Sequence, residues 1–366
     1  MRNTRLWAWV AAFIAICAAA YFYFFNPLAP QQPTINVLAW TGYEEPQLTQ
    51  AFEKATGIRV NVKTYVGGDQ MYSIFSTTKN TYDAVIVDTE YLKPLHDAGR
   101  LSALEANSLN YTGYFPYFVT FPSAHFGGET FGVPVRFGVN GIVYNTDHFS
   151  EQDVQSYAVL MSDRAKGHVG IWDWYLPSMG VLSKAVGNHD AYNLTEAQYI
   201  SLLKEMRELR PQVAAIHPTP PDMIAALADG RTWLVPGVGD WVASVLEAQG
   251  KHIDWAVPKE GGIMWVETLT IPSDAPHREL AKKYLEWMMS PQAQAILTQL
   301  HAYNSNATNR LTYTFLTAAQ RHRLKADSDK NVEAMIENLS LRELPKAQDP
   351  RRWQNDWQGF KANTLH

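Results

Sequence analysis

Cysteine is nearly absent from this 366-residue sequence: Cys17 stands alone, so neither an intramolecular disulfide nor a cysteine-based metal site can form. The HExxH, EF-hand, P-loop and GxSxG motifs are also missing, and the 11 histidines are widely scattered. The segment Gly237-Val238-Gly239 lacks the third glycine of a dinucleotide-binding fingerprint. These absences argue against a metalloenzyme, a nucleotide-dependent enzyme and a serine hydrolase of the α/β type. We therefore expect a protein that is not an enzyme and that uses no metal and no cofactor.

An excess of positive charge is absent as well. Lys plus Arg number 31 and Asp plus Glu number 36, which gives a formal net charge of −5 without any basic run. Proteins that bind nucleic acids through the phosphate backbone carry the opposite balance, so we expect no nucleic-acid partner. The modest acidic excess slightly favours a cationic partner, although a surface charge that only keeps the protein soluble is the simpler explanation.

Charge is missing altogether from one long segment near the N-terminus. Residues 6–25 are 20 consecutive apolar residues, enough for a helix that spans a bilayer of about 30 Å. Arg2 and Arg5 precede this run, and the next basic residue is Lys54, which predicts a cytoplasmic N-terminus and an exported remainder. We expect residues 1–30 to form a membrane anchor, or a signal segment cleaved near Ala18, followed by a proline-rich linker to residue 34.

The exported part alternates between strand and helix patterns. Short β-branched or apolar runs predict strands, and apolar residues at helical spacing predict helices between them. The first three strands are expected at residues 35–40, 59–65 and 82–87, each followed by a helix, at 45–56, 69–79 and 89–98. This βαβαβα order predicts an α/β fold with a parallel sheet, in which ligands lie beyond the carboxyl ends of the strands.

Two extended segments, near residues 133–145 and 260–272, divide the chain into parts. We expect two αβ lobes, each with a parallel or mixed sheet, joined by these two crossover strands around a cleft that serves as the binding site. The expected boundaries are residues 35–137 plus 266–310 for lobe 1 and 138–265 for lobe 2. Residues 311–366 are expected to form helices that pack on the lobes.

Aromatic residues are the most informative feature of the remaining sequence. Ten of the 12 tryptophans lie outside the predicted anchor, and several fall at strand ends or in the crossover segments, among them Trp40, Trp172, Trp174 and Trp265. A cleft lined by aromatic rings and a few carboxylates suits an organic cation. For any single tryptophan, packing in the core is an equally good explanation.

Several segments resemble extracellular solute-binding proteins of the spermidine/putrescine-binding type. The similarity is collinear over about residues 35–310, and its most specific parts are the opening INVLAWTGY, the crossover segment FGVPVRFGVNGIVYN, and the pair VPKEGGIMWVETLTIPSDAPH and LEWMMSPQAQAIL. The resemblance implies a two-lobed periplasmic binding protein, type II-like, that closes on its ligand and delivers it to an ABC transporter permease.

The resemblance also implies particular ligand contacts. Trp40, Thr41 and Tyr43 match the aromatic and hydroxyl contacts that polyamine binders supply after the first strand, and Trp265 and Glu267 match the tryptophan and the acidic residue that follow the PKEGG turn. The tryptophan ring would pack flat against the methylene chain, and the carboxylate would pair with an ammonium group.

Three positions depart from the family pattern. Asp88-Thr89-Glu90 stands where the family often has Ser-x-Tyr, so Asp88 and Glu90 are candidate ligand contacts. Asp88 could instead cap the helix that begins at Thr89, and Glu90 could simply favour the helix dipole. Trp174 occupies a position where spermidine binders carry an acidic residue. The set of carboxylates is therefore rearranged.

Arg136 has two possible roles. It follows Val133-Pro134-Val135 in the first crossover segment, where polyamine binders tend to be uncharged. It could hold a ligand carboxylate, which would indicate an amino acid-like or anionic ligand, or it could pair with Glu267, Asp88 or Glu90 across the cleft.

Together these observations predict a periplasmic substrate-binding protein, tethered to the inner membrane through residues 6–25. We expect it to capture a small organic cation of the polyamine type and to deliver it to an ABC transporter permease. The alternatives are a ligand-sensing co-receptor for a membrane signalling protein, and a binder of a small carboxylate or amino acid held by Arg136.

Overall fold

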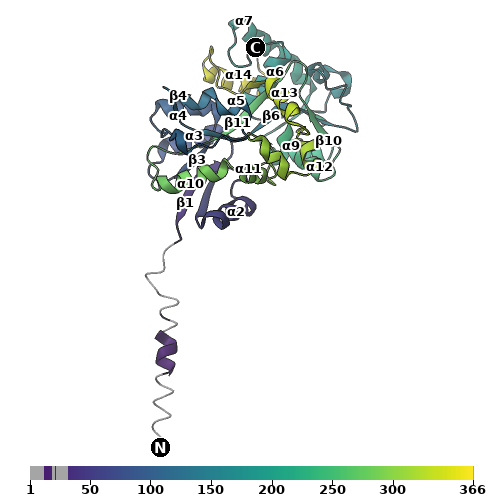
Figure 1. Ribbon diagram of the computed structural model, residues 1–366. Helices are drawn as coiled ribbons and strands as arrows, with labels where there is room; N and C mark the ends of the chain where they lie inside the picture. The colour runs from purple at the N-terminus through teal and green to yellow at the C-terminus, as the bar shows by residue number, and fades with distance from the viewer. Residues whose placement is uncertain (1–11, 19–20, 22–31, 366) are drawn as a thin grey trace, which may run out of the picture. The chain divides into compact units, whose positions relative to one another are not determined.

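The computed structural model describes residues 12–18, 21 and 32–365 (Figure 1). Residues 1–33 and 34–366 form two separate units. In the first unit residues 12–18 are helical. Over the described ranges, no helix combines the length and the apolar character needed to cross a membrane. The rest of the predicted anchor, residues 6–11, 19–20 and 22–25, lies outside the described residues.

The second unit begins with the βαβ order expected from the sequence. Its first elements are β1 (Thr34–Trp40), α2 (Pro46–Thr56), β2 (Arg59–Tyr65), α3 (Gly68–Thr77) and β3 (Ala84–Asp88). Strand β1 pairs in parallel with both β2 and β3, which confirms the predicted parallel sheet. Helix α2 ends where Gly57 takes a left-handed conformation with a φ of 74°, a conformation that costs little without a Cβ atom. After β3 a short 3₁₀ turn (Thr89–Tyr91) precedes α4 (Leu92–Asp97), where the sequence predicts one continuous helix.

Eleven of the strands in the described residues form one continuous sheet. Its order is β2-β1-β3-β11-β6-β9-β7-β8, with β10 and β12 beside β6 and β13 beside β11. The long strand β6 (Val133–Asn145) pairs antiparallel with β11 (Gly262–Thr270) up to Asn140, and from Gly141 onward with β9 (Leu234–Val238). The two predicted crossover strands therefore exist, and they connect the two expected sheets by hydrogen bonds.

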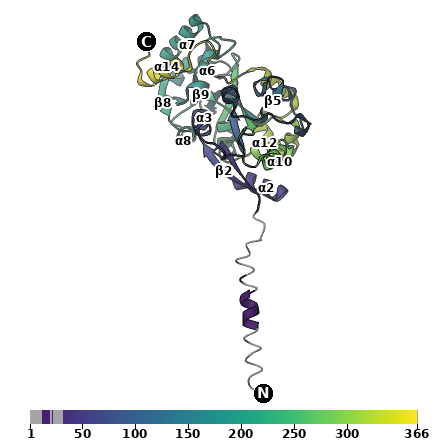
Figure 2. The same cartoon turned by 90° about the vertical axis from the view of Figure 1, so that its left-hand side faces the viewer.

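The second half of the sheet carries its own helices. The elements here are β7 (Val169–Trp172), α6 (Tyr175–Ala185), α7 (Glu196–Leu209), β8 (Val213–His217), α8 (Pro220–Ala228), α9 (Asp240–Ala248) and β10 (Ile253–Ala256). In both views of the molecule, α6, α7 and α14 lie at the end of this unit opposite to α2 (Figures 1 and 2). Thr195 caps α7 as predicted, with a reciprocal hydrogen-bonding pair to Gln198.

Three local features of this half differ from what the sequence pattern predicts. The pattern predicts no strand at β8, because its short sequence VAAIH is alanine-rich and only partly buried at the sheet edge. It predicts a strand over residues 232–235 that ends at Pro236-Gly237, but β9 continues through this pair, because the ladder to β6 shifts register there and accommodates the proline. It predicts a helix from Met179 to Val186, but α6 begins four residues earlier, at Tyr175.

The C-terminal segment contributes to both halves. It contains α10 (Arg278–Met288), α11 (Pro291–Leu297), β12 (Asn306–Ala307), α12 (Ala318–Arg323), α13 (Asp329–Glu337), β13 (Leu339–Leu341) and α14 (Pro350–Ala362). Strand β13, which was not predicted, runs parallel to β11. Helix α14 packs on α6 and α7 and buries Trp353, Trp357 and Phe360. The remaining short elements are α5 (Pro116–Val119), β4 (His125–Phe126) and β5 (Glu129–Thr130).

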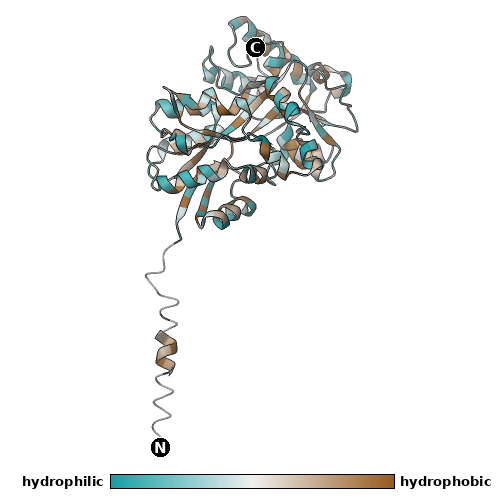
Figure 3. Ribbon diagram, in the orientation of Figure 1, coloured by the Kyte–Doolittle hydropathy of each residue, from teal (hydrophilic) through white to brown (hydrophobic). Residues whose placement is uncertain are grey.

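The buried apolar residues separate into distinct cores. One surrounds β1–β3 and the first part of β6, a second lies between β7, α6, α7 and α14, and a third packs under α8 and α9. In Figure 3 the brown, apolar residues gather on the strands, and the helices outside them carry teal, polar faces. Because both faces of the sheet are covered, β3, β6 and β11 are buried along their whole length.

Candidate functional site

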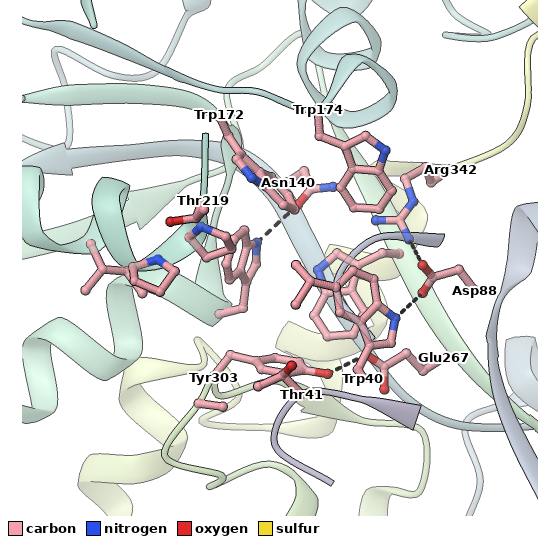
Figure 4. Close-up of a pocket in the computed structure, with 17 residues that line it drawn as sticks. Trp40, Thr41, Asp88, Asn140, Trp172, Trp174, Thr219, Glu267, Tyr303 and Arg342 are labelled. Carbon is pink, nitrogen blue, oxygen red and sulfur yellow. Dashed lines mark hydrogen bonds and ion pairs between the residues drawn. The ribbon is translucent and has the colours of Figure 1, made fainter. Parts of the chain in front are cut away.

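A cavity of about 580 Å³ lies at the carboxyl ends of β1, β3 and β7. Its wall is mainly aromatic, and five tryptophans contribute to it: Trp40 on β1, Trp172 on β7, Trp174 just before α6, Trp241 on α9 and Trp265 on β11. The polar side chains at the wall include Thr41, Asp88, Asn140, Glu267 and Arg342 (Figure 4). The expectation that a site forms where the parallel strands end agrees with this position.

The tryptophans form a connected group of rings. The ring centroids of Trp40 and Trp174 are 6.1 Å apart, those of Trp172 and Trp174 are 4.9 Å apart, and those of Trp172 and Trp241 are 5.1 Å apart. Trp265 lies 6.2 Å from the ring of Tyr303. Tilted, closely spaced aromatic rings therefore line one cavity, and groups of such rings can attract organic cations.

Glu267 is held by a buried hydrogen-bonding network behind the wall. The Nε atom of Arg136 donates to Glu267 Oε2 at 2.8 Å, Tyr43 OH donates to the same oxygen at 2.6 Å, and Tyr303 OH donates to Oε1 at 2.7 Å. Arg136 is completely buried, and its guanidinium lies 4.0 Å from the ring centre of Tyr303. The carboxylate of Glu267 therefore already has a cationic partner.

A second buried cluster surrounds Asp88. Trp40 Nε1 donates to Asp88 Oδ1 at 3.0 Å, and the guanidinium of Arg342 lies 3.2 Å from Asp88 Oδ2 and 2.8 Å from Glu90 Oε1. Arg342 also lies over the ring of Trp174, 4.5 Å from its centre. Burial raises the pKa of Asp88 well above its usual value, and Arg342 opposes this shift by favouring the carboxylate.

Six of the nine predicted site residues line the cavity, and three lie behind its wall. The lining residues are Trp40, Thr41, Asp88, Trp174, Trp265 and Glu267. Tyr43 and Arg136 instead hold Glu267, and Glu90 is buried against Arg342. For Arg136 the structure shows the internal ion pair, so its guanidinium is already engaged and does not face the cavity.

The structure also shows how the side chains of Asp88 and Asp173 are used within the fold. Asp88 precedes the 3₁₀ turn at Thr89, but its side chain makes no capping hydrogen bond, so the helix-cap interpretation was wrong. Asp173, next to Trp174, accepts hydrogen bonds from Trp357 Nε1 and Lys361 Nζ, each at 2.8 Å. It therefore anchors α14 and is absent from the cavity wall.

Several lining residues were not proposed as ligand contacts from the sequence. For Trp172 and Trp241 the sequence did contain a signal, because both are tryptophans that stand at the end of a strand or at the start of a helix. Asn140, Tyr303 and Arg342 gave none, because each reaches the cavity only through long-range contacts. Asn140 is placed by the pairing of β6 with β11, Arg342 by the hydrogen bond from its backbone N–H to Met264, and Tyr303 by the hydrogen bond from its hydroxyl to Glu267. In the portion of the chain that the structure describes, no cluster of three or more His, Cys, Asp or Glu residues could hold a metal ion.

Comparisons with known proteins agree with this geometry. The spermidine/putrescine-binding periplasmic protein of Escherichia coli is 27% identical over 281 residues, covering 75% of this chain and 78% of that protein. The putrescine-binding periplasmic protein of the same organism is 24% identical over 344 residues, covering 88% and 89%.

Solved structures show the same fold. A spermidine/putrescine ABC transporter protein from Listeria monocytogenes superimposes with a TM-score of 0.73 at 19% identity, covering 90% of this chain and 98% of that one. The spermidine/putrescine substrate-binding protein of Streptococcus pneumoniae gives 0.74 at 18% identity, with 91% and 98% covered. The two-lobed periplasmic binding protein fold is thereby confirmed. The model of the bacterial extracellular solute-binding protein family matches residues 47–314, and this chain belongs to that family.

Proposed function

We propose that this protein captures a small organic amine cation, with polyamines as the first candidates, and delivers it to an ABC transporter permease. The observation that carries the proposal is the cavity with five tryptophans and two carboxylates, Asp88 and Glu267. Tryptophan faces attract ammonium groups and pack against methylene chains, and the carboxylates supply negative charge. The names of the relatives in Escherichia coli support the same ligand class.

We further propose that binding is coupled to closure of two lobes. Lobe 1 comprises residues 35–137 and 266–310, and lobe 2 comprises residues 138–265. The change of pairing partner along β6 at Asn140–Gly141 and the separation of the apolar cores support these boundaries. A ligand that contacts both walls of the cavity would favour the closed form, and closure would create the surface that the permease recognises.

The protein belongs to a family that binds solutes, and we propose that it does not turn its ligand over. Incubation of the purified protein with each bound amine, followed by mass analysis of the small molecules, should recover the amine unchanged. Conversion of the amine that is lost in Glu267→Gln would overturn the binding-only proposal.

We also propose that the protein resides in the periplasm and is tethered to the inner membrane by residues 6–25, because this apolar run is long enough to span a bilayer. Its relatives are periplasmic by name. Membrane fractions washed with alkaline carbonate should retain the chain. A chain cleaved near Ala18 would instead appear in the soluble periplasmic fraction.

Calorimetric titration tests the ligand class directly. The purified chain, unfolded and refolded to remove bound ligand, is titrated with putrescine, spermidine and related amines, and then with small carboxylates. Micromolar or tighter binding of an amine is expected. Glu267→Gln should weaken it, while Glu208→Gln on the exposed face of α7 should not. Binding of carboxylates alone would contradict the proposal.

A further inference from the structure

The charges beside the cavity nearly cancel one another. Three carboxylates, of Asp88, Glu90 and Glu267, face two guanidinium groups, of Arg136 and Arg342, all of them buried. Full ionisation therefore leaves a single net negative charge beside the cavity, and burial, which raises the pKa of Asp88 and of Glu90, can only reduce this charge. A ligand with one positive charge would neutralise it, whereas a ligand with two would leave an uncompensated buried cation, which is costly in an apolar cavity.

The next carboxyl group, that of Asp240, adds only part of a negative charge near neutral pH. Asp240 accepts hydrogen bonds from the backbone N–H groups of Val139 and Trp241 and from Asn306 Nδ2, and it is absent from the cavity wall. Burial raises its pKa to about 7, so near neutral pH it is only partly ionised.

One lining side chain has an unused hydrogen-bond donor. Asn140 is 1% exposed, and its Oδ1 accepts from Trp241 Nε1 at 3.3 Å. Asn140 is a lining residue of the cavity, and its Nδ2 is buried without an acceptor within the part of the chain described here. A buried N–H group without a partner is unfavourable, so this position favours a ligand that brings a hydrogen-bond acceptor.

The amino-terminal end of α6 adds to the same preference. This helix of 11 residues begins after Trp174, a lining residue, and has neither a side-chain cap nor an acidic residue in its first turn. Its partial positive charge favours an electronegative group. Helices α8 and α9 also begin near the cavity, but Asp222 and Asp240 in their first turns offset this effect.

The donor and the carboxylates lie in different parts of the cavity. In Figure 4, Asn140 lies with Trp172 and Trp174, whereas Asp88 and Glu267 lie closer to Trp40. We infer that the preferred ligand carries one ammonium group and, at its other end, an uncharged hydrogen-bond acceptor, as in a monoacylated diamine, rather than two ammonium groups. This inference rests on the proposed function, because it specifies which amine the same cavity selects.

Four ligands built on a four-carbon chain separate the possibilities on the unmodified protein. N-acetylputrescine has one ammonium and one amide, putrescine has two ammonium groups, butylamine has one ammonium only, and 4-aminobutyrate has an ammonium and a carboxylate. Calorimetry should show N-acetylputrescine binding about tenfold more tightly than each of the other three. Tightest binding of putrescine would overturn the inference and leave the proposed function standing. Tightest binding of 4-aminobutyrate, or equal binding of butylamine, would also overturn it. No binding of any amine would contradict the proposed function itself.

Two variants test the residues named. Asn140→Leu removes the free donor and should weaken N-acetylputrescine about five- to tenfold while leaving butylamine unchanged. Arg342→Met removes a positive charge and should raise the affinity for putrescine relative to N-acetylputrescine, while Arg342→Lys, which keeps the charge, should not. Thermal unfolding with and without putrescine should show a larger stabilisation of Arg342→Met than of the unmodified protein. An unchanged ligand preference in both Asn140→Leu and Arg342→Met would contradict the inference.

Discussion

At the scale of single residues, two arginines explain why the carboxylates of this cavity do not act as free charges. Arg136 and Arg342 are both buried, and each contacts a carboxylate within 3.2 Å. A buried ion pair gives little net stability, because desolvation of both groups offsets their attraction. Removal of only one partner of the pair is costly, because the remaining charge stays buried without a partner.

The first prediction concerns Glu267 and Arg136. Glu267→Ala should lower the free energy of unfolding by about 3–5 kcal/mol, because it leaves the guanidinium of Arg136 without its partner. The double variant Arg136→Met/Glu267→Met should recover most of this loss. Urea denaturation of the single and double variants measures both values. A double variant that is as unstable as Glu267→Ala would show that the pair itself stabilises the fold.

The second prediction concerns pH. Burial raises the pKa of Asp240 to about 7 in the folded state, whereas the unfolded chain has the ordinary value near 4. The folded state therefore holds more protons between these values, so the contribution of this group to stability is complete below about pH 4 and is lost as the pH rises to about 7. The free energy of unfolding, measured by urea denaturation, should fall less between pH 5 and pH 8 for Asp240→Asn than for the unmodified protein. An equal fall of the free energy of unfolding in both proteins would contradict the assignment of a raised pKa to Asp240.

At the scale of elements, the shape of the cavity depends on the close approach of β6 and β11. Gly138 pairs with Trp265, and a Cβ atom at position 138 would lie 2.2 Å from the indole ring. The absent side chain therefore leaves room for the ring at the cavity wall. Sequence patterns identified both strands, but the register that places this glycine opposite Trp265 came only from their pairing.

The third prediction follows from this contact. Gly138→Ala should displace the ring of Trp265, lower the free energy of unfolding by about 1–3 kcal/mol and weaken amine binding. Gly359→Ala is the matched control, because position 359 lies in α14 with no contact closer than 3.5 Å. The control should be unchanged or slightly more stable. Calorimetry and thermal unfolding measure both effects, and unchanged binding in Gly138→Ala would exclude a role for the position of Trp265.

The C-terminal helix is a second element whose role emerges only from the fold. Trp353 on α14 is completely buried and packs against Tyr192 and Tyr199, with ring centroids 5.9 and 5.5 Å away. The sequence predicts helices in this region but gives no partner for them. In the structure, Asp173, next to the cavity tryptophan Trp174, accepts hydrogen bonds from Trp357 and Lys361 on this helix.

The fourth prediction therefore concerns α14. Trp353→Ala should lower the free energy of unfolding by about 3–5 kcal/mol, since it leaves a large cavity in a packed core. Lys361→Met, which only removes the ion pair with the half-buried Asp173, should cost about 1 kcal/mol or less. Urea denaturation distinguishes the two. A loss below 1 kcal/mol for Trp353→Ala would show that α14 is not a stable part of the fold.

At the scale of the whole molecule, the proposed mechanism requires two parts that move relative to each other. The cavity wall combines residues from β1, β3 and β11 with residues from β7, α8 and α9. The strands β6 and β11 and the C-terminal segment connect these groups of elements through pairing and packing. Ligands that contact both groups would favour the closed arrangement.

The fifth prediction is a measurable closure. Small-angle X-ray scattering of residues 34–366, which form their own unit, should show a smaller radius of gyration with a saturating amine than without it. Trp40→Ala should reduce this change, because its ring contacts Trp174 across the cavity at 6.1 Å. An identical scattering curve with and without bound ligand would contradict closure.

The amino-acid sequence by itself determined the α/β class, the order of the first strands and helices, and the two crossover strands, because these depend on local patterns of apolar residues and turns. It also indicated Trp40, Trp174 and Trp265, since strand ends and crossover segments gather at one edge of such a fold, whereas Glu267 was indicated by the resemblance to spermidine/putrescine-binding proteins. Only the tertiary structure decided which charges neutralise each other. Arg342 reaches Asp88 and Glu90 across about 250 positions of sequence, and no local pattern encodes a contact that forms only when β13 pairs with β11.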